Sequence, residues 1–339
     1  MPRPGWLAAA CDLLLVDRFV KPAVFGVQTA VAPDDAMNRQ RRKFVVASRH
    51  SSFAGARMNL RSIAAGAMLV TLIPHAVNAD TLGRVQTSGV FRIGYRLDAR
   101  PFSYRSATGE PAGYIVELCR DVAVAVNQKV GGGPFDINYV LVDAQNRFAA
   151  LRDGAVDIVC DSSSITMERR EIVGFSLPTF IDGASLLCRA REDLLTFESL
   201  DQKRVGAVAG TTSETLLRKA VAGLGINASI TTVKDYPAGL DHLLDQKLDA
   251  FLGDRSILAS VVKDRWPGSG LRLSKSYFSY EIYALALPKD DEAFRLLVDR
   301  TLARLYRNGR VKALLARTFG DIEDDPVLQN LIVINSIPE

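Results

Sequence analysis

Polar and charged side chains gather where an expected strand ends, near the middle of the chain. Residues 156–159 form a short apolar run typical of a buried strand, and residues 160–164 (CDSSS) follow it directly. Thr166 and Arg169 then open the next expected helix. In open α/β sheets, ligands bind beyond the carboxyl ends of the strands. Free N–H groups at a helix N-terminus suit a carboxylate, and an arginine adds a planar two-point grip. The segment therefore predicts a site for a small anion.

A second segment repeats this arrangement. The expected strand at residues 204–209 runs into residues 210–214 (GTTSE), which lead into another expected helix. A hydroxyl just before a helix can also be an ordinary N-cap, and for each segment taken alone that alternative stays open. Facing each other, the two segments form a clamp for one small anion.

Other kinds of chemistry are poorly supplied after residue 80. The single histidine there, His242, has no obvious partner and is interpreted as a solvated surface residue. The sequence contains no P-loop, no nucleophile elbow, no H-E-x-x-H motif and no paired-cysteine zinc spacing. It therefore argues against an enzyme, and we expect no metal and no cofactor.

The elements that must position these residues alternate along the chain. Between residues 91 and 263, short apolar runs typical of strands alternate with amphipathic stretches typical of helices. This alternation indicates an α/β protein with mostly parallel sheets. Amphipathic helices are also expected at residues 292–306 and 310–319.

Two extended segments divide the chain further. Residues 183–189 lead into the second series of strands and helices, and residues 282–287 lead out of it. We expect a discontinuous first lobe (80–184 plus 286–339), a second lobe (188–281) and a hinge of two strands, which is an architecture that closes over a ligand.

The net charge of +4 belongs to the N-terminal segment. The first 57 residues hold nine Lys or Arg and four Asp or Glu, whereas residues 80–339 hold 32 and 34. No cluster of basic residues among aromatics follows residue 80, so nucleic acid is not an expected partner.

Residues 58–79 have the pattern of a secretory signal peptide. Met58 and Arg61 precede an uncharged, mostly apolar stretch (63–73), and small residues end the segment. We expect cleavage before Asp80 and a periplasmic product. Residues 1–57 are interpreted as an over-extended reading frame or a disordered extension. A buried helix or an uncleaved anchor at 58–79 is the alternative.

Three cysteines follow the expected cleavage point: Cys119, Cys160 and Cys188. At most one disulfide can form within the chain, and the sequence does not choose a pair. Buried free thiols are the favoured interpretation.

The chain resembles the family-3 extracellular solute-binding proteins of polar amino acid ABC importers, and is most similar to their glutamate/aspartate-binding branch. The stretches that carry the resemblance lie in the family's order and spacing: SGVFRIGYRLDARPFSY (88–104), GYIVELCRDVAVAV (113–126), QNRFAALRDGAVDIVCDSSSITMERR (145–170), GTTSETLLRK (210–219) and LPKDDEAFRLLVDRTLARLYRNG (287–309). The resemblance implies a two-lobed type II periplasmic binding protein fold and delivery of an amino acid to a membrane permease with its ATPase.

Site residues are carried over from the family position by position. Arg169, with Ser164 and Thr212, would hold the α-carboxylate of the ligand. Ser162 and Asp254 would hold the α-ammonium group. An ordinary helix cap is the alternative for Asp254.

The resemblance also points to residues around the ligand side chain. Arg96 and Arg147 would favour a side-chain carboxylate, although each could instead be a surface arginine or an inter-lobe ion pair. Tyr236 stands where the acidic branch usually has His, and Asp161 stands where it usually has Gly. Together these residues predict a monomeric binding protein for a glutamate- or aspartate-like ligand. The alternatives are a cyclohexadienyl or arogenate dehydratase on the same fold, with Glu281 or Asp98 as the acid, and a ligand-sensing module.

Overall fold

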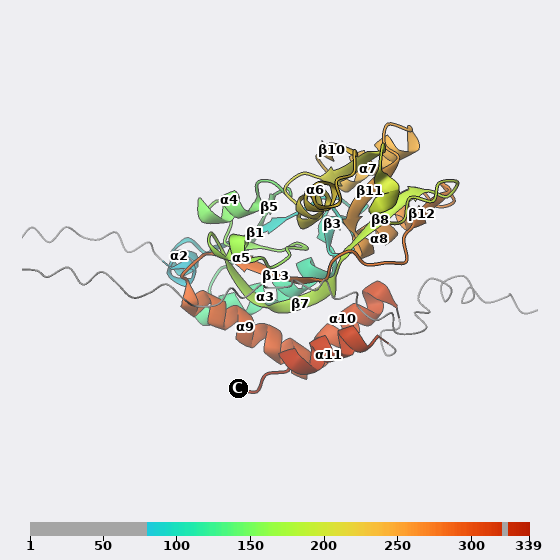
Figure 1. The fold of residues 1–339 in the computed structure, drawn as a ribbon. Helices are drawn as coiled ribbons and strands as arrows, with labels where there is room; N and C mark the ends of the chain where they lie inside the picture. The colour runs from blue at the N-terminus through green and yellow to red at the C-terminus, as the bar shows by residue number, and fades with distance from the viewer. Residues whose placement is uncertain (1–79, 321–324) are drawn as a thin grey trace, which may run out of the picture. The chain divides into compact units, whose positions relative to one another are not determined.

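The computed structural model describes residues 80–320 and 325–339. The expected signal peptide and the segment before it lie outside the described residues. The described chain contains two five-stranded sheets and one small three-stranded sheet, with helices packed against them (Figure 1). We call each large sheet with its helices a lobe.

The first lobe is built on a sheet whose strands come from two distant parts of the sequence. In sheet order they are β5 (Asp136–Leu141), β1 (Val90–Tyr95), β6 (Ile158–Val159), β13 (Glu281–Leu287) and β7 (Gly174–Asp182). Strands β5, β1 and β6 run parallel, whereas β13 is antiparallel to both of its neighbours. The lobe is therefore discontinuous in sequence.

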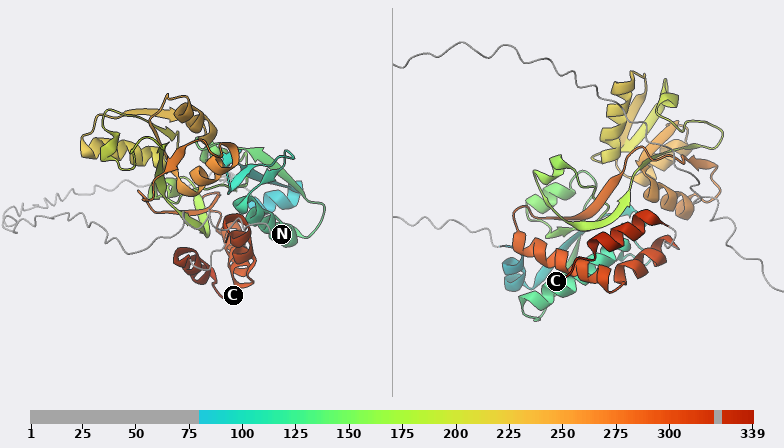
Figure 2. Two further views of the ribbon diagram at one scale, coloured as in Figure 1. Left: turned by 90° about the vertical axis from the view of Figure 1, so that its right-hand side faces the viewer. Right: turned by 60° about the horizontal axis from the view of Figure 1, so that its bottom comes forward.

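Helices and a small sheet complete this lobe. The helices are α2 (Thr81–Ser88), α3 (Tyr114–Val130), α4 (Arg147–Arg152), α5 (Met167–Arg170), α9 (Glu292–Arg307), α10 (Arg310–Phe319) and α11 (Pro326–Asn335). The small sheet is β2 (Asp98–Ala99), β3 (Ser103–Arg105) and β4 (Pro111–Ala112). In the views of Figures 1 and 2, α9, α10 and α11 gather along one side of the lobe, and α9 packs on α3.

The second lobe has a sheet of the same size. Its order is β10 (Ser229–Val233), β9 (Arg204–Val208), β11 (Ala250–Asp254), β8 (Ala184–Arg189) and β12 (Leu271–Leu273). Its helices are α6 (Thr212–Leu224), α7 (Tyr236–Leu244) and α8 (Arg255–Arg265), with a short 3-10 turn, η1 (Glu198–Leu200). Strands β10, β9 and β11 are parallel, and β8 is antiparallel to β11.

Both large sheets are thus mixed, which differs from the mostly parallel sheets expected from sequence. The reason lies in the connections, because parallel neighbours need a crossover helix between them. Strand β7 passes into β8 through Gly183 alone, and β13 returns from the second lobe without a helix. A Cβ at Gly183 would lie 1.9 Å from Ser279 O, so the two connecting segments touch where they cross between the lobes.

The expectation of buried free thiols is wrong for two of the three cysteines. Cys119 on α3 and Cys160 after β6 form a disulfide, with their Cα atoms 6.3 Å apart. Cys188 on β8 is free and buried. The bond joins α3 to the end of β6, which is the point where the predicted CDSSS segment begins.

Candidate functional site

The loop after β6 carries the first group of predicted residues. Residues 161–164 are all buried, because the loop lies against β13 and shares backbone hydrogen bonds with it. The side chain of Thr166 caps α5 by accepting a hydrogen bond from Arg169 N at 3.1 Å. The capping role belongs to Thr166, which leaves Ser162 and Ser164 available for other partners.

Arg169 reaches from this loop to the second lobe. Its guanidinium donates to Ser164 O at 2.8 Å and to Gly210 O, in the other lobe, at 3.3 Å. It also lies 5.1 Å from the ring centroid of Phe148. Burial lowers the pKa of Arg169, and nearby carboxylates, Asp161 first, act in the opposite direction. Arg169 is half-buried, and an anion at this place would pair with its charge.

In the second predicted segment (210–214), one residue caps the helix and another belongs to the candidate site, as in the first segment. Thr211 is the N-cap of α6, and its hydroxyl accepts from Glu214 N at 3.2 Å. Thr212 begins the helix, and its Oγ1 lies 3.4 Å from Ser164 Oγ across the two lobes. It also donates to Glu281 Oε2 at 2.5 Å. The two segments do face each other.

Asp254 closes the site from the end of β11. Its carboxylate accepts from the Tyr283 hydroxyl at 2.7 Å and from Ser213 Oγ at 3.1 Å, and it makes no hydrogen bond that caps α8. Burial raises the pKa of Asp254 to about 6, and the negative charge of Glu281 adds to the effect. The capping alternative for this residue is not what the geometry shows.

Tyr236 and Arg96 meet at the edge of the small sheet. Tyr236 N donates to Asp98 Oδ2 at 3.2 Å, and Asp254 N donates to the Tyr236 hydroxyl at 3.4 Å. Arg96 holds the same Asp98 through two hydrogen bonds of 2.9 and 2.7 Å and lies 5.8 Å from the Tyr236 ring centroid. Burial works against the charge on Arg96, but Asp98 outweighs it, and the pKa of Arg96 is raised. Arg96 already has a carboxylate partner.

Arg147 is 2% exposed and is also engaged by the protein. Its Nε donates to Ser163 Oγ at 3.1 Å and lies 3.3 Å from Asp161 Oδ2, and one terminal nitrogen donates to Ala144 O. Burial lowers the pKa of Arg147 to about 10, against the attraction of Asp161. Arg147 is therefore a buried cation, and not a surface arginine.

The eight predicted residues thus lie in one region, where Arg169 and Thr212 are half-buried and the other six are buried. The region also includes several further residues. In the loop after β6, two polar atoms have no hydrogen-bond partner among the described residues: Ser162 Oγ and Asp161 Oδ2, the latter 3.3 Å from Arg147 Nε. Buried polar groups are nearly always hydrogen-bonded, so two orphans beside one another mark a place where a ligand can donate.

Three acidic residues of this region were not among the predicted binding residues: Asp98, Asp182 and Glu281. Asp98 and Glu281 were named only as possible acids of an enzyme. Their roles depend on contacts with Tyr236, Ser164 and Thr212, which are far away in the sequence. Asp182 is the last residue of β7, just before Gly183. A carboxylate at a strand end is the same pattern that identified the other site residues, so this position could have been predicted from the sequence.

Asp182 is an unusual carboxyl group. It is 3% exposed, accepts from Ser256 N at 3.1 Å, lies 3.3 Å from the Tyr283 hydroxyl oxygen, and keeps Oδ1 without a hydrogen-bond partner among the described residues. Burial, with the charge of Asp254, raises the pKa of Asp182 from 3.8 to about 8. The native state therefore holds this proton more tightly than the unfolded chain does. The stability that comes with the proton is complete below pH 3.8 and is lost as the pH rises through about 8.

Asp182→Asn is accordingly expected to raise the melting temperature relative to the natural protein at pH 9, with a gain that shrinks towards pH 5. The amide stays neutral, so it avoids the cost of a buried charge at high pH. Thermal unfolding followed at several pH values measures this, with Asp153→Asn at an exposed carboxylate as the control. An offset that does not vary with pH would show that Asp182 titrates normally.

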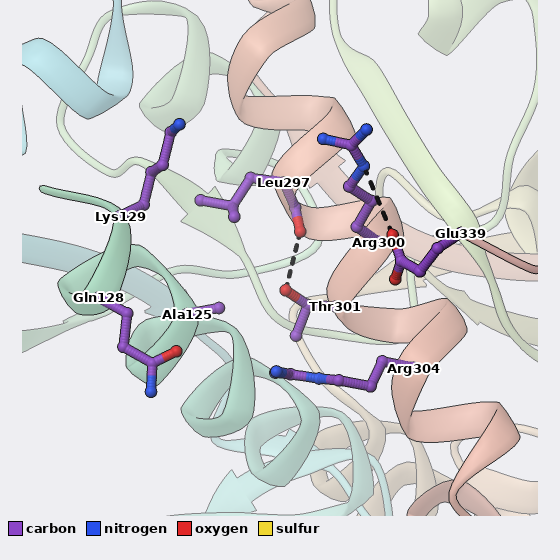
Figure 3. A pocket seen from close by; sticks show the side chains of 8 residues that line it. All are labelled: Ala125, Gln128, Lys129, Leu297, Arg300, Thr301, Arg304 and Glu339. Atoms are coloured by element: carbon purple, nitrogen blue, oxygen red, sulfur yellow. Dashed lines mark hydrogen bonds and ion pairs between the residues drawn. The ribbon is translucent and has the colours of Figure 1, made fainter.

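A separate depression of about 300 Å³ lies between α3 and α9 (Figure 3). It is lined by Ala125, Gln128, Lys129, Leu297, Arg300, Thr301, Arg304 and Glu339. None of the eight predicted residues lines it. In Figure 3, Arg300 turns towards Glu339, with which it forms an ion pair at 3.9 Å.

No group of three or more His, Cys, Asp or Glu side chains in residues 80–320 and 325–339 is placed to hold a metal ion. Within the same ranges, no helix is both long enough and apolar enough to cross a membrane.

Comparison with known proteins identifies relatives of this chain by sequence. The chain is 30% identical to the L-glutamate/L-aspartate-binding protein of Pseudomonas aeruginosa, over 76% of this chain and 87% of that one. It is 29% identical to the glutamate/aspartate import solute-binding protein of Escherichia coli, over 77% and 89%. These relatives are binding proteins, in agreement with the argument against an enzyme.

Solved structures confirm the expected fold class. An ancestral arginine-binding protein superposes with a TM-score of 0.62 at 24% identity, over 69% of this chain and 99% of that one. The L-cysteine solute receptor of Neisseria gonorrhoeae gives 0.62 at 23%, over 70% and 93%. The family model for bacterial extracellular solute-binding proteins, family 3, matches residues 91–321. The chain therefore belongs to the bacterial extracellular solute-binding proteins of family 3.

Proposed function

We propose that this protein is the periplasmic substrate-binding component of an amino acid ABC importer, and that it binds an acidic amino acid between its lobes. One observation carries the proposal. From the first lobe, Arg169 donates to Gly210 O of the second lobe at 3.3 Å, and the hydroxyl oxygen of Ser164 lies 3.4 Å from that of Thr212. A carboxylate has two oxygens and can accept from a guanidinium and from hydroxyls on both sides.

The other end of a zwitterion would be held by acceptors. Ser162 Oγ has no hydrogen-bond partner among the described residues, and Asp161 Oδ2 is paired by charge with Arg147 and lies near the charges of Arg169 and Arg96. The carboxylate of Asp254 lies in the same region. An α-ammonium group offers three donors, which suits acceptors from both lobes.

Arg96 and Arg147 remain the proposed contacts for a side-chain carboxylate, with Tyr236 beside them. Each of the two arginines is partly neutralised, by Asp98 and Asp161 respectively. A ligand carboxylate would therefore share these guanidinium groups with a protein carboxylate. The names of the two relatives above support an acidic ligand. Because Asp98 and Asp161 already pair with the two arginines, the preference for acidic over amide ligands must be measured.

The proposed boundaries and setting follow the sequence. Residues 58–79 act as a cleaved signal peptide. The lobes keep the bounds proposed from the sequence (80–184 plus 286–339, and 188–281) except at the crossing strands, because all of β8 (Ala184–Arg189) belongs to the second sheet and all of β13 (Glu281–Leu287) to the first. The mature protein works as a monomer in the periplasm and docks, closed, on an inner-membrane permease served by a separate ATPase. A ligand drives closure only through its higher affinity for the closed state.

A thermal-shift screen tests the proposal. The purified protein is melted with each of the twenty amino acids and with related dicarboxylates. A ligand at 100 times its dissociation constant stabilises the native state by about 2.7 kcal/mol. We expect the largest shifts with glutamate or aspartate. If no amino acid shifts the melting temperature, the proposed function is wrong.

A further inference from the structure

Glu281 occupies the place proposed for the carboxylate of the ligand. It is the first residue of β13, its side chain is 8% exposed, and it lies opposite Asp182 in the sheet. Its Oε2 accepts from Thr212 Oγ1 at 2.5 Å and from Ser164 Oγ, while Oε1 accepts from Ser279 Oγ at 2.9 Å. One carboxylate oxygen thus connects a hydroxyl of the first lobe to a hydroxyl of the second.

The number of available donors makes this contact exclusive. A serine or threonine hydroxyl has one proton to donate. Ser164 and Thr212 both direct that proton to Glu281, so neither can donate to a ligand carboxylate at the same time. Arg169 stands close enough for the charge of Glu281 to raise its pKa, against the larger effect of burial. Two carboxylates at one pair of hydroxyls would also repel each other.

Resting on the proposed function, we infer that Glu281 is an internal competitor of the ligand and thereby sets the affinity of the site. In the unliganded protein its carboxylate joins Ser164 to Thr212 and holds the lobes together. Ligand binding displaces it, and the α-carboxylate of the ligand takes over both hydroxyls. Glu281 competes with the α-carboxylate, which all amino acids have. It therefore lowers the affinity for every amino acid ligand by the same factor.

The position of Glu281 couples this exchange to the hinge. The residue adjoins the segment that crosses between the lobes, where Ser279 O approaches Gly183 and Ser279 Oγ accepts from Ala184 N at 2.9 Å. When Glu281 leaves Ser164 and Thr212, the direct link between these two side chains and the start of β13 is broken. Closure around a ligand then depends on the ligand instead of on Glu281.

The test compares the natural protein with Glu281→Gln and Glu281→Ala by calorimetric titration of glutamate and aspartate. A binding-competent population of one in ten weakens the apparent affinity tenfold, so removal of the competitor is expected to lower Kd by about tenfold for both ligands. Glu292→Gln, an exposed charge on α9, is the control. An unchanged or raised Kd in Glu281→Ala, which removes the acceptor altogether, overturns the inference. Glu281→Gln loses the charge but keeps an acceptor oxygen, so its Kd is expected to fall between those of the natural protein and Glu281→Ala.

Small-angle scattering without ligand provides a second measurement that does not depend on the proposed function. We expect Glu281→Ala to have a larger radius of gyration than the natural protein and the Glu292→Gln control, because the inter-lobe contact is lost. The amide oxygen of Glu281→Gln can still accept from both hydroxyls, so this variant is expected to lie between Glu281→Ala and the natural protein. Equal radii overturn the inference even if the ligand screen fails. Failure of the screen with larger radii refutes the proposed function and leaves Glu281 as the inter-lobe link.

Discussion

Arg169→Ala is expected to weaken the binding of every amino acid ligand by at least about 30-fold. Loss of one partner from a buried, hydrogen-bonded charge pair costs about 2–5 kcal/mol, and tenfold in affinity corresponds to about 1.4 kcal/mol. The effect does not depend on the ligand side chain, because Arg169 is assigned to the carboxylate that all amino acids have. Calorimetric titration with acidic and amide amino acids measures it.

Two other arginines serve as comparisons for this prediction. Arg170→Ala, at the exposed neighbour on α5, is expected to leave affinity unchanged. Arg147→Ala is expected to weaken acidic ligands more than amide ligands, since Arg147 is assigned to the side-chain end. Comparing ligands within one variant removes any general loss from leaving Asp161 without its partner. Equal losses for both ligand classes in Arg147→Ala would refute this division of the site.

Removal of the disulfide is expected to lower the free energy of unfolding by about 4 kcal/mol. Cys119 and Cys160 are 41 residues apart in the sequence. By the chain-entropy relation, a cross-link that closes a loop of that size restricts the unfolded chain by about this amount. Urea unfolding of Cys119→Ala with Cys160→Ala measures the loss.

Sensitivity to a reducing agent distinguishes this cause from altered packing. The natural protein should lose stability when a reductant is added, and the double variant should not change further. Cys188→Ala, which removes the free buried thiol, keeps the response to the reductant. If the natural protein is equally stable with and without reductant, the bond contributes nothing.

The fold could be predicted where strands are short, apolar and followed by helices. The strand expected at residues 204–209 is β9 within one residue, and the extended segments expected at 183–189 and 282–287 are β8 and β13 within one residue. Strand β7 was missed because its sequence, GFSLPTFID, contains Pro178, which argues against a central strand. The structure places β7 at the edge of its sheet, where a proline is tolerated. Pro178 is paired with Ala284 of β13, and the register of the two strands shifts on both sides of Ala284.

The site could be predicted as a set of residues but not as a set of partners. Strand ends and the resemblance brought together Ser164, Arg169, Thr212 and Asp254. The pairing of Cys119 with Cys160, and the contact of Glu281 with Ser164 and Thr212, depend on how β6, β13 and α6 pack. Those contacts join residues 41 to 117 positions apart, beyond the reach of any local pattern.

The central claim is that one amino acid lies between the lobes with its α-carboxylate on Arg169. A crystal structure of the protein with the amino acid that gives the largest thermal shift tests this most directly. The account predicts ligand carboxylate oxygens at hydrogen-bond distance, about 3 Å, from Arg169, Ser164 and Thr212, with Glu281 displaced. A ligand bound elsewhere, or bound between the lobes without contact to Arg169, would contradict it.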